Sequence, residues 1–392
     1  MVKRIIKFNK NNSLLLFGAR GTGKTTFIQK EILPLFDTDD YWYFDLLKAE
    51  IEDRFLRDPD SLESEFLASK IKPKVIIIDE IQKVPKLLDL AHRLIESHQV
   101  VFVLTGSSAR KLKQQSANLL AGRAFSERLF PLTHRELGDH FNLEQALNFG
   151  TLPSVCFFEF DDQRHNYLRT YALAYVKEEV QLEQLVRKLK PFREFLEIAA
   201  QMSGKIVNAS KVAKDVGVDD KTVHSYYDIL VDTYLGFYLP PFHRSVRKSQ
   251  RKSPKFYLFD CGVKRALERS LHAKVVPGTS YYGDTFEQFI ICEIFRLNEY
   301  LHQDYRISYF ETTAGGEVDI VLSRGPKETL LVEIKSSEKI DEIEVKKLAS
   351  IQKEFMANKA YYLSNDPIRK EVLGVNCVPW SLGLDEIFPS KK

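Results

Sequence analysis

Short runs of apolar residues dominate the pattern of the first third of the chain. Four of them have the length of strands buried in a parallel sheet, and none is long enough to span a membrane. They cover residues 14–17, 41–44, 75–78 and 100–104. Between the second and third runs, Leu62, Phe66 and Leu67 have helical spacing. Strands that alternate with helices predict an α/β fold with a parallel sheet.

The glycine-rich segment after the first apolar run carries the strongest chemical signal. From residue 18 the sequence reads GARGTGKTT, with the spacing G-x-x-x-x-G-K-T, and residues 26–30 continue with a helical pattern. Strand, glycine loop and helix start form the context of a P-loop, whose backbone N–H groups turn toward a polyphosphate. We predict that Lys24 reaches the β- and γ-phosphates of ATP and that Thr25 binds Mg²⁺. The other predicted nucleotide contacts are Gly18, Gly21, Thr22, Gly23 and Thr26.

A second signal lies at the end of the third apolar run, where Asp79 and Glu80 follow four β-branched residues. This is the Walker B pattern. It predicts that a buried strand delivers Asp79 to the Mg²⁺ shell and that Glu80 orients or deprotonates the attacking water. After the fourth apolar run, Thr105 and Ser107 are candidates to contact the γ-phosphate or the water. The alternative is that this segment caps a following helix, with Ser108 as the N-cap.

The combined segments GARGTGKTT, IIIDEIQKVP, LTGSSAR, LAGR and PLTHREL resemble a family of bacterial and archaeal AAA+-type ATPases. In that family the ATPase block precedes a large domain of unknown function, and the resemblance extends over nearly the whole chain. It implies an AAA+ core over residues 1–140 and an arginine that acts on the nucleotide of a neighbouring subunit. Arg123 is our candidate for this finger, with Arg110 and Arg128 as alternatives. A finger acting in trans implies a homo-oligomer, a hexamer by analogy with the class.

The middle of the chain has a helical pattern. Residues 141–190 are interpreted as a helical lid. Within residues 191–242, a helix over 210–218 and a second one over 219–227 are separated by a turn at Gly217. This order indicates a helix-turn-helix in a winged-helix-like segment, with residues 235–241 as the returning strand.

Two features of this region bear on nucleic acid. The second helix offers four candidates for a DNA groove: Lys221, Thr222, His224 and Ser225. A packing module inside a multidomain ATPase accounts for the same pattern, and Asp219 and Asp220 would repel phosphates. Residues 243–255 form the densest basic run of the chain, which is either a phosphate-binding segment or a solvated linker.

The last domain, residues 255–392, combines an apolar helix with three strand patterns. The helix over 283–294 carries Glu287, and a buried carboxylate is costly unless it is paired or bound to a metal. Asp319 and Glu333 lie on the second and third strands. Lys335 follows Glu333 by two positions and therefore lies on the same face. Two carboxylates and an ammonium are thus expected at one point.

This order of residues is similar to the PD-(D/E)xK nuclease superfamily, which has the restriction-endonuclease-like fold. The resemblance implies that Asp319 and Glu333 bind Mg²⁺ or Mn²⁺ and that Lys335 positions or activates water for attack on a phosphodiester. Glu287 is the supporting acid. The alternative is a retained fold that binds nucleic acid without cutting it.

Composition changes this picture little. The 392 residues suffice for two or three domains, and the net charge of +3 is uninformative as a total. The first ten residues lack the apolar segment of a secretory signal. The cysteines are far apart without metal-site spacing, which suits a reducing cytosol: Cys156, Cys261, Cys292 and Cys377. We expect a cytoplasmic protein without a membrane partner.

These observations predict an ATP-hydrolysing AAA+ protein coupled to Mg²⁺-dependent cleavage of nucleic acid, DNA in preference to RNA. One alternative is an ATP-dependent switch or DNA-binding ATPase whose nuclease-like domain does not cut. Another is a transcriptional regulator that acts through the helix-turn-helix.

Overall fold

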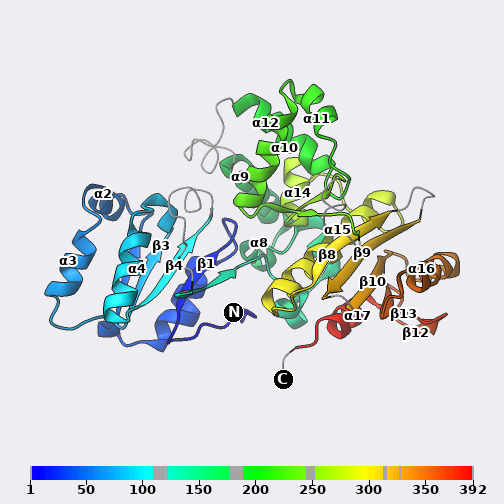
Figure 1. Cartoon of the computed structure of the whole chain (residues 1–392). Helices are drawn as coiled ribbons and strands as arrows, with labels where there is room; N and C mark the ends of the chain where they lie inside the picture. The colour runs from blue at the N-terminus through cyan, green and yellow to red at the C-terminus, as the bar shows by residue number, and fades with distance from the viewer. Residues whose placement is uncertain are drawn as a thin grey trace. The chain divides into compact units, whose positions relative to one another are not determined.

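The computed structural model describes residues 2–108, 120, 122–175, 189–243, 252–311, 316–325 and 328–390. The chain divides into two compact units (Figure 1). Unit 1 comprises Met1–Leu132 and Asp232–Leu235, and unit 2 comprises Thr133–Val231 and Gly236–Lys392. The finer division into four domains stays a prediction.

A parallel sheet forms the centre of unit 1. Among the described residues it has five strands in the order β2-β3-β4-β1-β5. They are β1 (Ser13–Phe17), β2 (Tyr41–Asp45), β3 (Val75–Asp79), β4 (Val101–Gly106) and β5 (Ala124–Arg128). Every residue of β1 and β3 is buried, which explains their continuous apolar sequences. The sequence pattern did not indicate β5, because this edge strand reads AFSER and is largely exposed.

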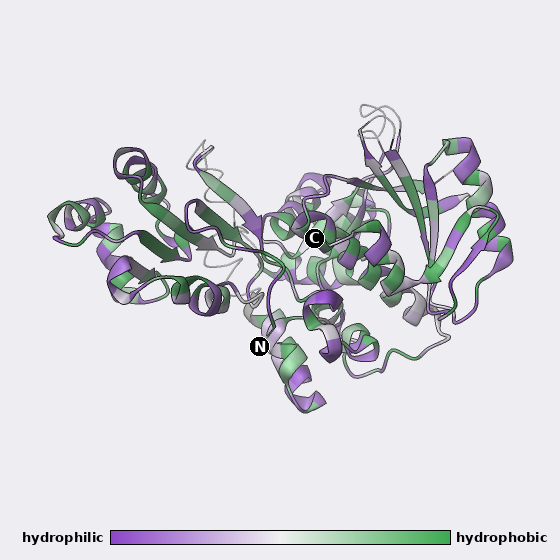
Figure 2. Ribbon diagram, turned by 90° about the horizontal axis from the view of Figure 1, so that it is seen from below, coloured by the Kyte–Doolittle hydropathy of each residue, from purple (hydrophilic) through white to green (hydrophobic). Residues whose placement is uncertain are grey.

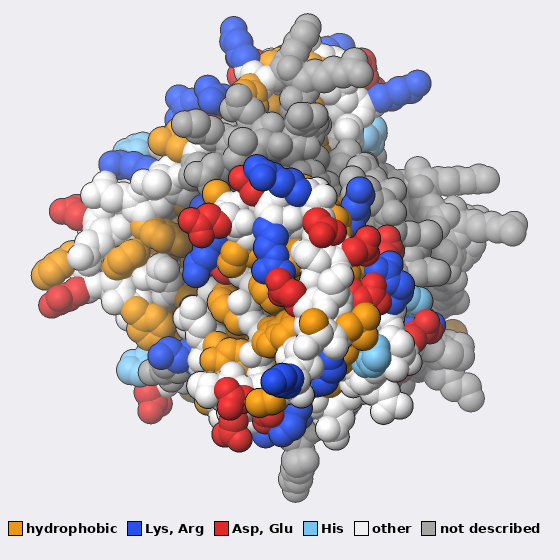
Figure 3. Space-filling view, turned by 90° about the vertical axis from the view of Figure 1, so that its left-hand side faces the viewer, with side chains coloured by type: hydrophobic (Ala, Val, Ile, Leu, Met, Phe, Trp, Pro, Cys, Tyr) orange, Lys and Arg blue, Asp and Glu red, His pale blue; other side chains and the backbone are white. Residues whose placement is uncertain are grey.

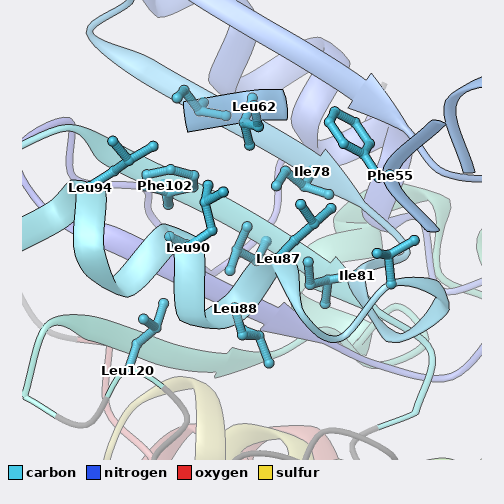
Figure 4. Close-up of a cluster of buried hydrophobic side chains, with 14 of the residues drawn as sticks. Phe55, Leu62, Ile78, Ile81, Leu87, Leu88, Leu90, Leu94, Phe102 and Leu120 are labelled. Atoms are coloured by element: carbon cyan, nitrogen blue, oxygen red, sulfur yellow. The ribbon is translucent and has the colours of Figure 1, made fainter. Parts of the chain in front are cut away.

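The helices of unit 1 include α1 (Lys24–Phe27), α2 (Ala49–Arg57), α3 (Ser61–Ala68) and α4 (Leu87–His98). Helix α1 continues as a π-helical segment over Ile28–Ile32. In α4, Leu87, Leu90 and Leu94 recur at helical spacing and face the sheet, where Ile78 and Phe102 meet them (Figure 4). Phe55 of α2 and Leu62 of α3 join the same buried cluster. This packing holds the carboxyl ends of the strands in place.

The first part of unit 2 is helical. It contains α6 (His134–Leu137), α7 (Leu143–Phe149), α8 (Pro153–Phe157), α9 (Asp161–Tyr175), α10 (Leu189–Gln201), α11 (Ala209–Val216) and α12 (Asp220–Asp232). Helix α11 ends at Gly217, whose left-handed backbone (φ 72°) favours glycine. The antiparallel strands β6 (Gly236–Leu239) and β7 (Lys255–Leu258) follow. The helix-turn-helix and its returning strand therefore form as predicted. Part of the expected lid, residues 176–188, lies outside the described residues.

The rest of unit 2 is a mixed α/β arrangement. Its described helices are α14 (Cys261–Leu267), α15 (Ser280–Tyr300), α16 (Glu342–Phe355) and α17 (Trp380–Ile387). Its described strands are β8 (Arg306–Glu311), β9 (Glu317–Arg324), β10 (Glu328–Ile334), β11 (Lys359–Ser364), β12 (Lys370–Val372) and β13 (Val375–Pro379). They form one sheet in the order β12-β13-β11-β10-β9-β8. Strands β8, β9 and β10 pair antiparallel, as expected for a meander, whereas β10, β11 and β13 pair parallel.

Hydropathy separates the interior from the surface in both units. The strands are predominantly hydrophobic, whereas the helices combine hydrophobic and hydrophilic positions (Figure 2). On the side of the molecule that Figure 3 shows, basic and acidic side chains are interspersed among scattered hydrophobic ones. Within the described ranges, no helix has the length and apolar character needed to cross a membrane.

Candidate nucleotide and metal sites

The glycine loop lies between β1 and α1 and encloses the ammonium of Lys24. Lys24 is buried, and its Nζ donates to the carbonyl oxygens of Gly18 at 2.8 Å and of Ala19 at 3.3 Å. Gly21 (φ 79°) and Gly23 (φ 94°) have left-handed backbones, which side chains rarely adopt. A Cβ on Gly18 would lie 2.2 Å from the carbonyl oxygen of Leu129. The loop conformation therefore requires its glycines.

Asp79 ends β3 and accepts hydrogen bonds from three hydroxyl groups. Its Oδ2 accepts from Thr25 Oγ1 at 2.7 Å and from Tyr43 at 3.2 Å, and its Oδ1 accepts from Thr105 Oγ1. The carboxylate and the Thr25 hydroxyl thus form a set of hard oxygen atoms that fits Mg²⁺. Burial, and then the charge of Asp79, raises the pKa of Tyr43, which keeps this tyrosine a donor. Tyr43 was not among the predicted site residues, because only sheet pairing places β2 beside β3.

Glu80 follows β3 and is held by a set of polar contacts. Its backbone is left-handed (φ 62°), a conformation that costs a non-glycine residue roughly 1–3 kcal/mol. Ser107 Oγ donates to Glu80 Oε2 at 3.1 Å, and Gln82 Nε2 donates to both Glu80 Oε2 and Ser107 Oγ, the latter at 3.0 Å. The predicted Ser107 therefore contacts the predicted Glu80. Gln82 joins them and was missed, since glutamine is common in surface turns.

The two described arginine candidates lie at opposite ends of the same edge strand, β5. Arg123 immediately precedes β5, and its Nε donates to Glu96 Oε1 of α4 at 3.0 Å. Arg128 ends β5 opposite Phe17, at the edge of the P-loop, where its guanidinium lies 5.9 Å from the ring centre of Tyr234. Arg110 lies outside the described residues. Arg123 is thus not brought to the nucleotide site of its own chain, and its role as a finger stays a prediction.

In unit 2 the sheet and α15 bring together the predicted acids, Glu287, Asp319 and Glu333, which we call the acid cluster. Lys335 Nζ lies 3.8 Å from Asp319 Oδ2 and contacts Glu333 Oε1. Asp319 Oδ2 also accepts from the backbone N–H of Ile334 at 2.7 Å. Asp319 and the E-x-K pair therefore meet as the strand spacing predicts, and Glu287 lies near enough for the charge of Asp319 to raise its pKa.

The acid cluster holds more negative charge than its interior position accommodates. Burial, and then the charge of Asp319, raises the pKa of Glu287 to about 7 and that of Glu333 to about 8. Burial also raises the pKa of Asp319. Such shifts mean that a nearby cation would stabilise the ionised carboxylates.

The acid cluster offers oxygen atoms of the kind that bind a divalent metal ion. Glu333 Oε2 is buried without a hydrogen-bond partner among the described residues, and Asp319 and Glu333 supply the oxygen atoms that Mg²⁺ or Mn²⁺ prefers. Across the described ranges, no three His, Cys, Asp or Glu side chains are arranged to hold a metal ion. The fit therefore rests on these two carboxylates.

Strand β7 adds two residues beside the acid cluster: Tyr257, which the sequence did not single out, and Lys255, the last residue of the predicted basic run. Tyr257 donates its hydroxyl to Glu287 Oε1 at 2.9 Å. Lys255 Nζ donates to Glu317 Oε1 at 2.8 Å. The contact partners of these two residues are 30 and 62 positions away in sequence, so only the folded chain brings them together.

The helix-turn-helix residues have local partners. Asp219 Oδ1 accepts from the backbone N–H of Thr222, and its Oδ2 accepts from the Thr222 hydroxyl, both at 2.9 Å. Asp220 Oδ2 accepts from Ser210 Oγ at 2.5 Å. The two aspartates therefore stabilise the start of α12, and Thr222 takes part in this cap. Lys221 and His224 are exposed. Most of the basic run, residues 244–251, lies outside the described residues.

Three protein-family models match successive segments of the chain. Residues 10–138 match a family model described as an AAA domain. Residues 140–273 and 282–382 match two models described as domains of unknown function, DUF8612 and DUF4143. The chain thus contains an AAA-type P-loop domain with a five-stranded parallel sheet among its described residues, followed by a domain with a mixed sheet.

Similar proteins are found in bacteria and archaea. An uncharacterized protein of Mycobacterium tuberculosis is 27% identical over 226 residues, which are 55% of this chain and 50% of that protein. An uncharacterized protein of Methanocaldococcus jannaschii is 24% identical over 374 residues, 85% of this chain and 77% of that protein. The chain therefore spans about half the length of the mycobacterial relative.

Two solved structures show distant likeness. The Aeropyrum pernix ORC1 protein in complex with DNA has a TM-score of 0.33 and 13% identity, with 66% of this chain and 86% of that chain covered. AMPPCP-bound DnaA from Aquifex aeolicus has a TM-score of 0.30 and 14% identity, with 56% and 81% covered. Likeness at this level defines no activity for the present chain.

Proposed function

We propose that the protein hydrolyses ATP in unit 1 and cleaves phosphodiester bonds of nucleic acid, DNA before RNA, in unit 2. The observation that carries this proposal is the meeting of the buried acids Asp319 and Glu333 with the partly exposed Lys335, in a chain that also has a complete P-loop. Neither group of residues is explained by packing alone, because buried charges are costly without a chemical role or a partner.

The first half of the proposal concerns ATP. The loop N–H groups and the Lys24 ammonium bind the β- and γ-phosphates, and Thr25 and Asp79 would hold Mg²⁺. Glu80 orients the attacking water and accepts its proton at a carboxylate oxygen, while Ser107 and Gln82 fix the direction of that carboxylate. A bound Mg²⁺ would neutralise charge that develops on the phosphates.

The second half concerns the phosphodiester. Asp319 and Glu333 would hold Mg²⁺ or Mn²⁺, which would act as a Lewis acid on a phosphoryl oxygen. Lys335 orients the water for in-line attack, and Glu287, with Tyr257 as its donor, supports the charge of the cluster. The Lys335 pKa is raised: burial lowers it, but Asp319 and Glu333 raise it more, so this side chain serves as a cation rather than as a neutral base.

Arg123 supports an oligomeric ATPase. It lies at the amino end of β5, whereas the P-loop follows the carboxyl end of the adjacent strand β1. An arginine in this place serves the nucleotide of a second copy, as in a closed ring. We propose a homo-oligomer, a hexamer by analogy with AAA+ proteins.

The test is a plasmid-cleavage assay with Mg²⁺ or Mn²⁺, run in parallel with an ATPase assay on the same preparation. Asp319→Ala and Lys335→Ala should abolish cutting while ATP turnover persists, because both residues belong to unit 2. Cutting that survives both changes would remove the nuclease half of the proposal.

A second candidate is an ATP-dependent switch that binds nucleic acid without cutting it. It is favoured by the contacts of Lys335 with both Glu333 and Asp319, which partly neutralise the cluster within the protein. This candidate predicts ATP turnover that responds to DNA in a protein that leaves the plasmid intact with either metal.

A further inference from the structure

We propose that Lys255 of β7 binds a phosphate of the nucleic acid beside the acid cluster. In the absence of nucleic acid, Glu317 forms an ion pair with the Lys255 ammonium, and the phosphate replaces Glu317 when it binds. The inference rests on the proposed nuclease function and adds a substrate-binding residue to it. Lys255 is distant in sequence from the D…ExK residues and lies on β7, which pairs antiparallel with β6 of the winged-helix-like segment.

The geometry of β7 and β9 carries the proposal. Lys255 and Tyr257 are two positions apart on β7 and thus lie on the same face, where Tyr257 reaches Glu287 and Lys255 reaches Glu317. On β9, Glu317 and Asp319 are likewise two positions apart. The acid that holds Lys255 therefore lies on the same strand face as the predicted metal ligand.

The charge of Lys255 is retained in spite of its surroundings. Burial lowers its pKa, but the carboxylates of Glu287, Glu317 and Asp319 raise it more, and the net shift is upward. An ammonium has three donor hydrogens. Among the described residues, Glu317 is the acceptor found for Lys255 Nζ, and the ring of Tyr309 lies 5.2 Å away.

Exposure distinguishes the two partners of this ion pair. The Lys255 side chain is 10% exposed, whereas that of Glu317 is 51% exposed. The half-exposed carboxylate of Glu317 can turn into solvent, but the buried ammonium then lacks its acceptor, which is costly unless another anion takes its place. A phosphate oxygen that approaches the acid cluster then takes the place of Glu317 and satisfies the buried ammonium.

A second lysine provides a matched control. Lys264 of α14 is also buried, donates to Glu268 Oε2 at 2.8 Å and lies 5.0 Å from the ring of Tyr281. Its partner Glu268 is buried, with a side chain only 6% exposed, so this pair is closed to solvent. Lys255 and Lys264 therefore make the same kinds of contact, but only the former has a partner at the surface.

The experiment measures KM and kcat for cleavage of a fluorescently labelled duplex DNA, and Kd for the same duplex in Ca²⁺. Lys255→Met should raise KM and Kd by about tenfold, because a charged hydrogen bond to phosphate is lost. It should also reduce the slope of log Kd against log salt concentration by about 1, the value expected for the loss of one phosphate contact. Glu317→Gln should lower KM and Kd, because it removes the carboxylate that competes with phosphate for the Lys255 ammonium.

A purely structural ion pair predicts a different result. In that case Lys255→Met and Glu317→Gln both lower the melting temperature, and neither changes KM or the salt dependence beyond what Lys264→Met does. Equal KM and Kd for the wild type and both variants would overturn the inference. A wild type that never cuts removes the nuclease proposal instead, while the Kd measurements still decide whether Lys255 binds phosphate.

Discussion

The nucleotide site of unit 1 and the acid cluster of unit 2 balance their charges in different ways. In unit 1, Asp79 accepts from three hydroxyl groups and Lys24 donates to two carbonyl groups. In unit 2, the buried carboxylates of Asp319 and Glu333 lie close to the ammonium of Lys335, Glu287 is partly buried nearby, and the pKa values of all three acids are raised. Preformed hydrogen bonds hold the first site in shape, whereas the second has surplus negative charge that a cation would relieve.

The largest expected effect is a loss of ATP turnover when the nucleotide site of unit 1 is changed. Lys24→Ala should lower ATP turnover by about two to three orders of magnitude, because the loop loses its buried ammonium next to the phosphates. ATP hydrolysis measured by phosphate release checks this. Lys83→Ala, which removes a lysine paired with Glu52 at 2.5 Å, is the control and should leave turnover near the wild-type rate. Equal losses in both variants would contradict the assignment of Lys24.

A change in the acid cluster should separate activity from stability. Asp319→Asn should lower cutting by at least about a hundredfold, because it weakens a predicted metal ligand. The same change should leave the melting temperature in metal-free buffer unchanged or higher, since it removes one of several like charges from a buried position.

Metal addition sharpens this second prediction. Mg²⁺ or Mn²⁺ should raise the melting temperature of the wild type, because a ligand that binds the native state stabilises it, and Asp319→Asn should lose most of that gain. Differential scanning calorimetry with and without metal provides the measurement. A variant that is destabilised without metal and still gains the full stabilisation with it would argue for a purely structural aspartate.

The smallest expected effect concerns Gln82, which contacts Glu80 and Ser107. Gln82→Ala should lower kcat for ATP hydrolysis by about tenfold and leave KM for ATP nearly unchanged, because the residue orients Glu80 rather than the nucleotide. Gln82→Glu should lower kcat further, since it places a second carboxylate beside Glu80. Steady-state kinetics decide the matter. A rise in KM at constant kcat would place Gln82 in nucleotide binding instead.

The sequence predicted elements best where each signal is local. Strand β2 begins at Tyr41 and ends at Asp45, within the predicted aromatic run, and α11 ends before Gly217 as expected. Strand β5 was missed because an exposed edge strand needs no continuous apolar run. Most of the basic segment, residues 244–251, and Arg110 lie outside the described residues.

The sequence by itself determined the P-loop, the Walker B strand and the three acids of unit 2. The P-loop glycines, Lys24 and Thr25 are neighbours along the chain, and Asp79 and Glu80 end a strand whose apolar pattern marks it, so local spacing suffices to find them. Only the tertiary structure placed Tyr43 beside Asp79 and Lys255 beside Glu317. The two partners of each contact lie on different elements. Their contacts could not be predicted from the sequence, because they depend on the order and packing of the strands, which no local pattern encodes.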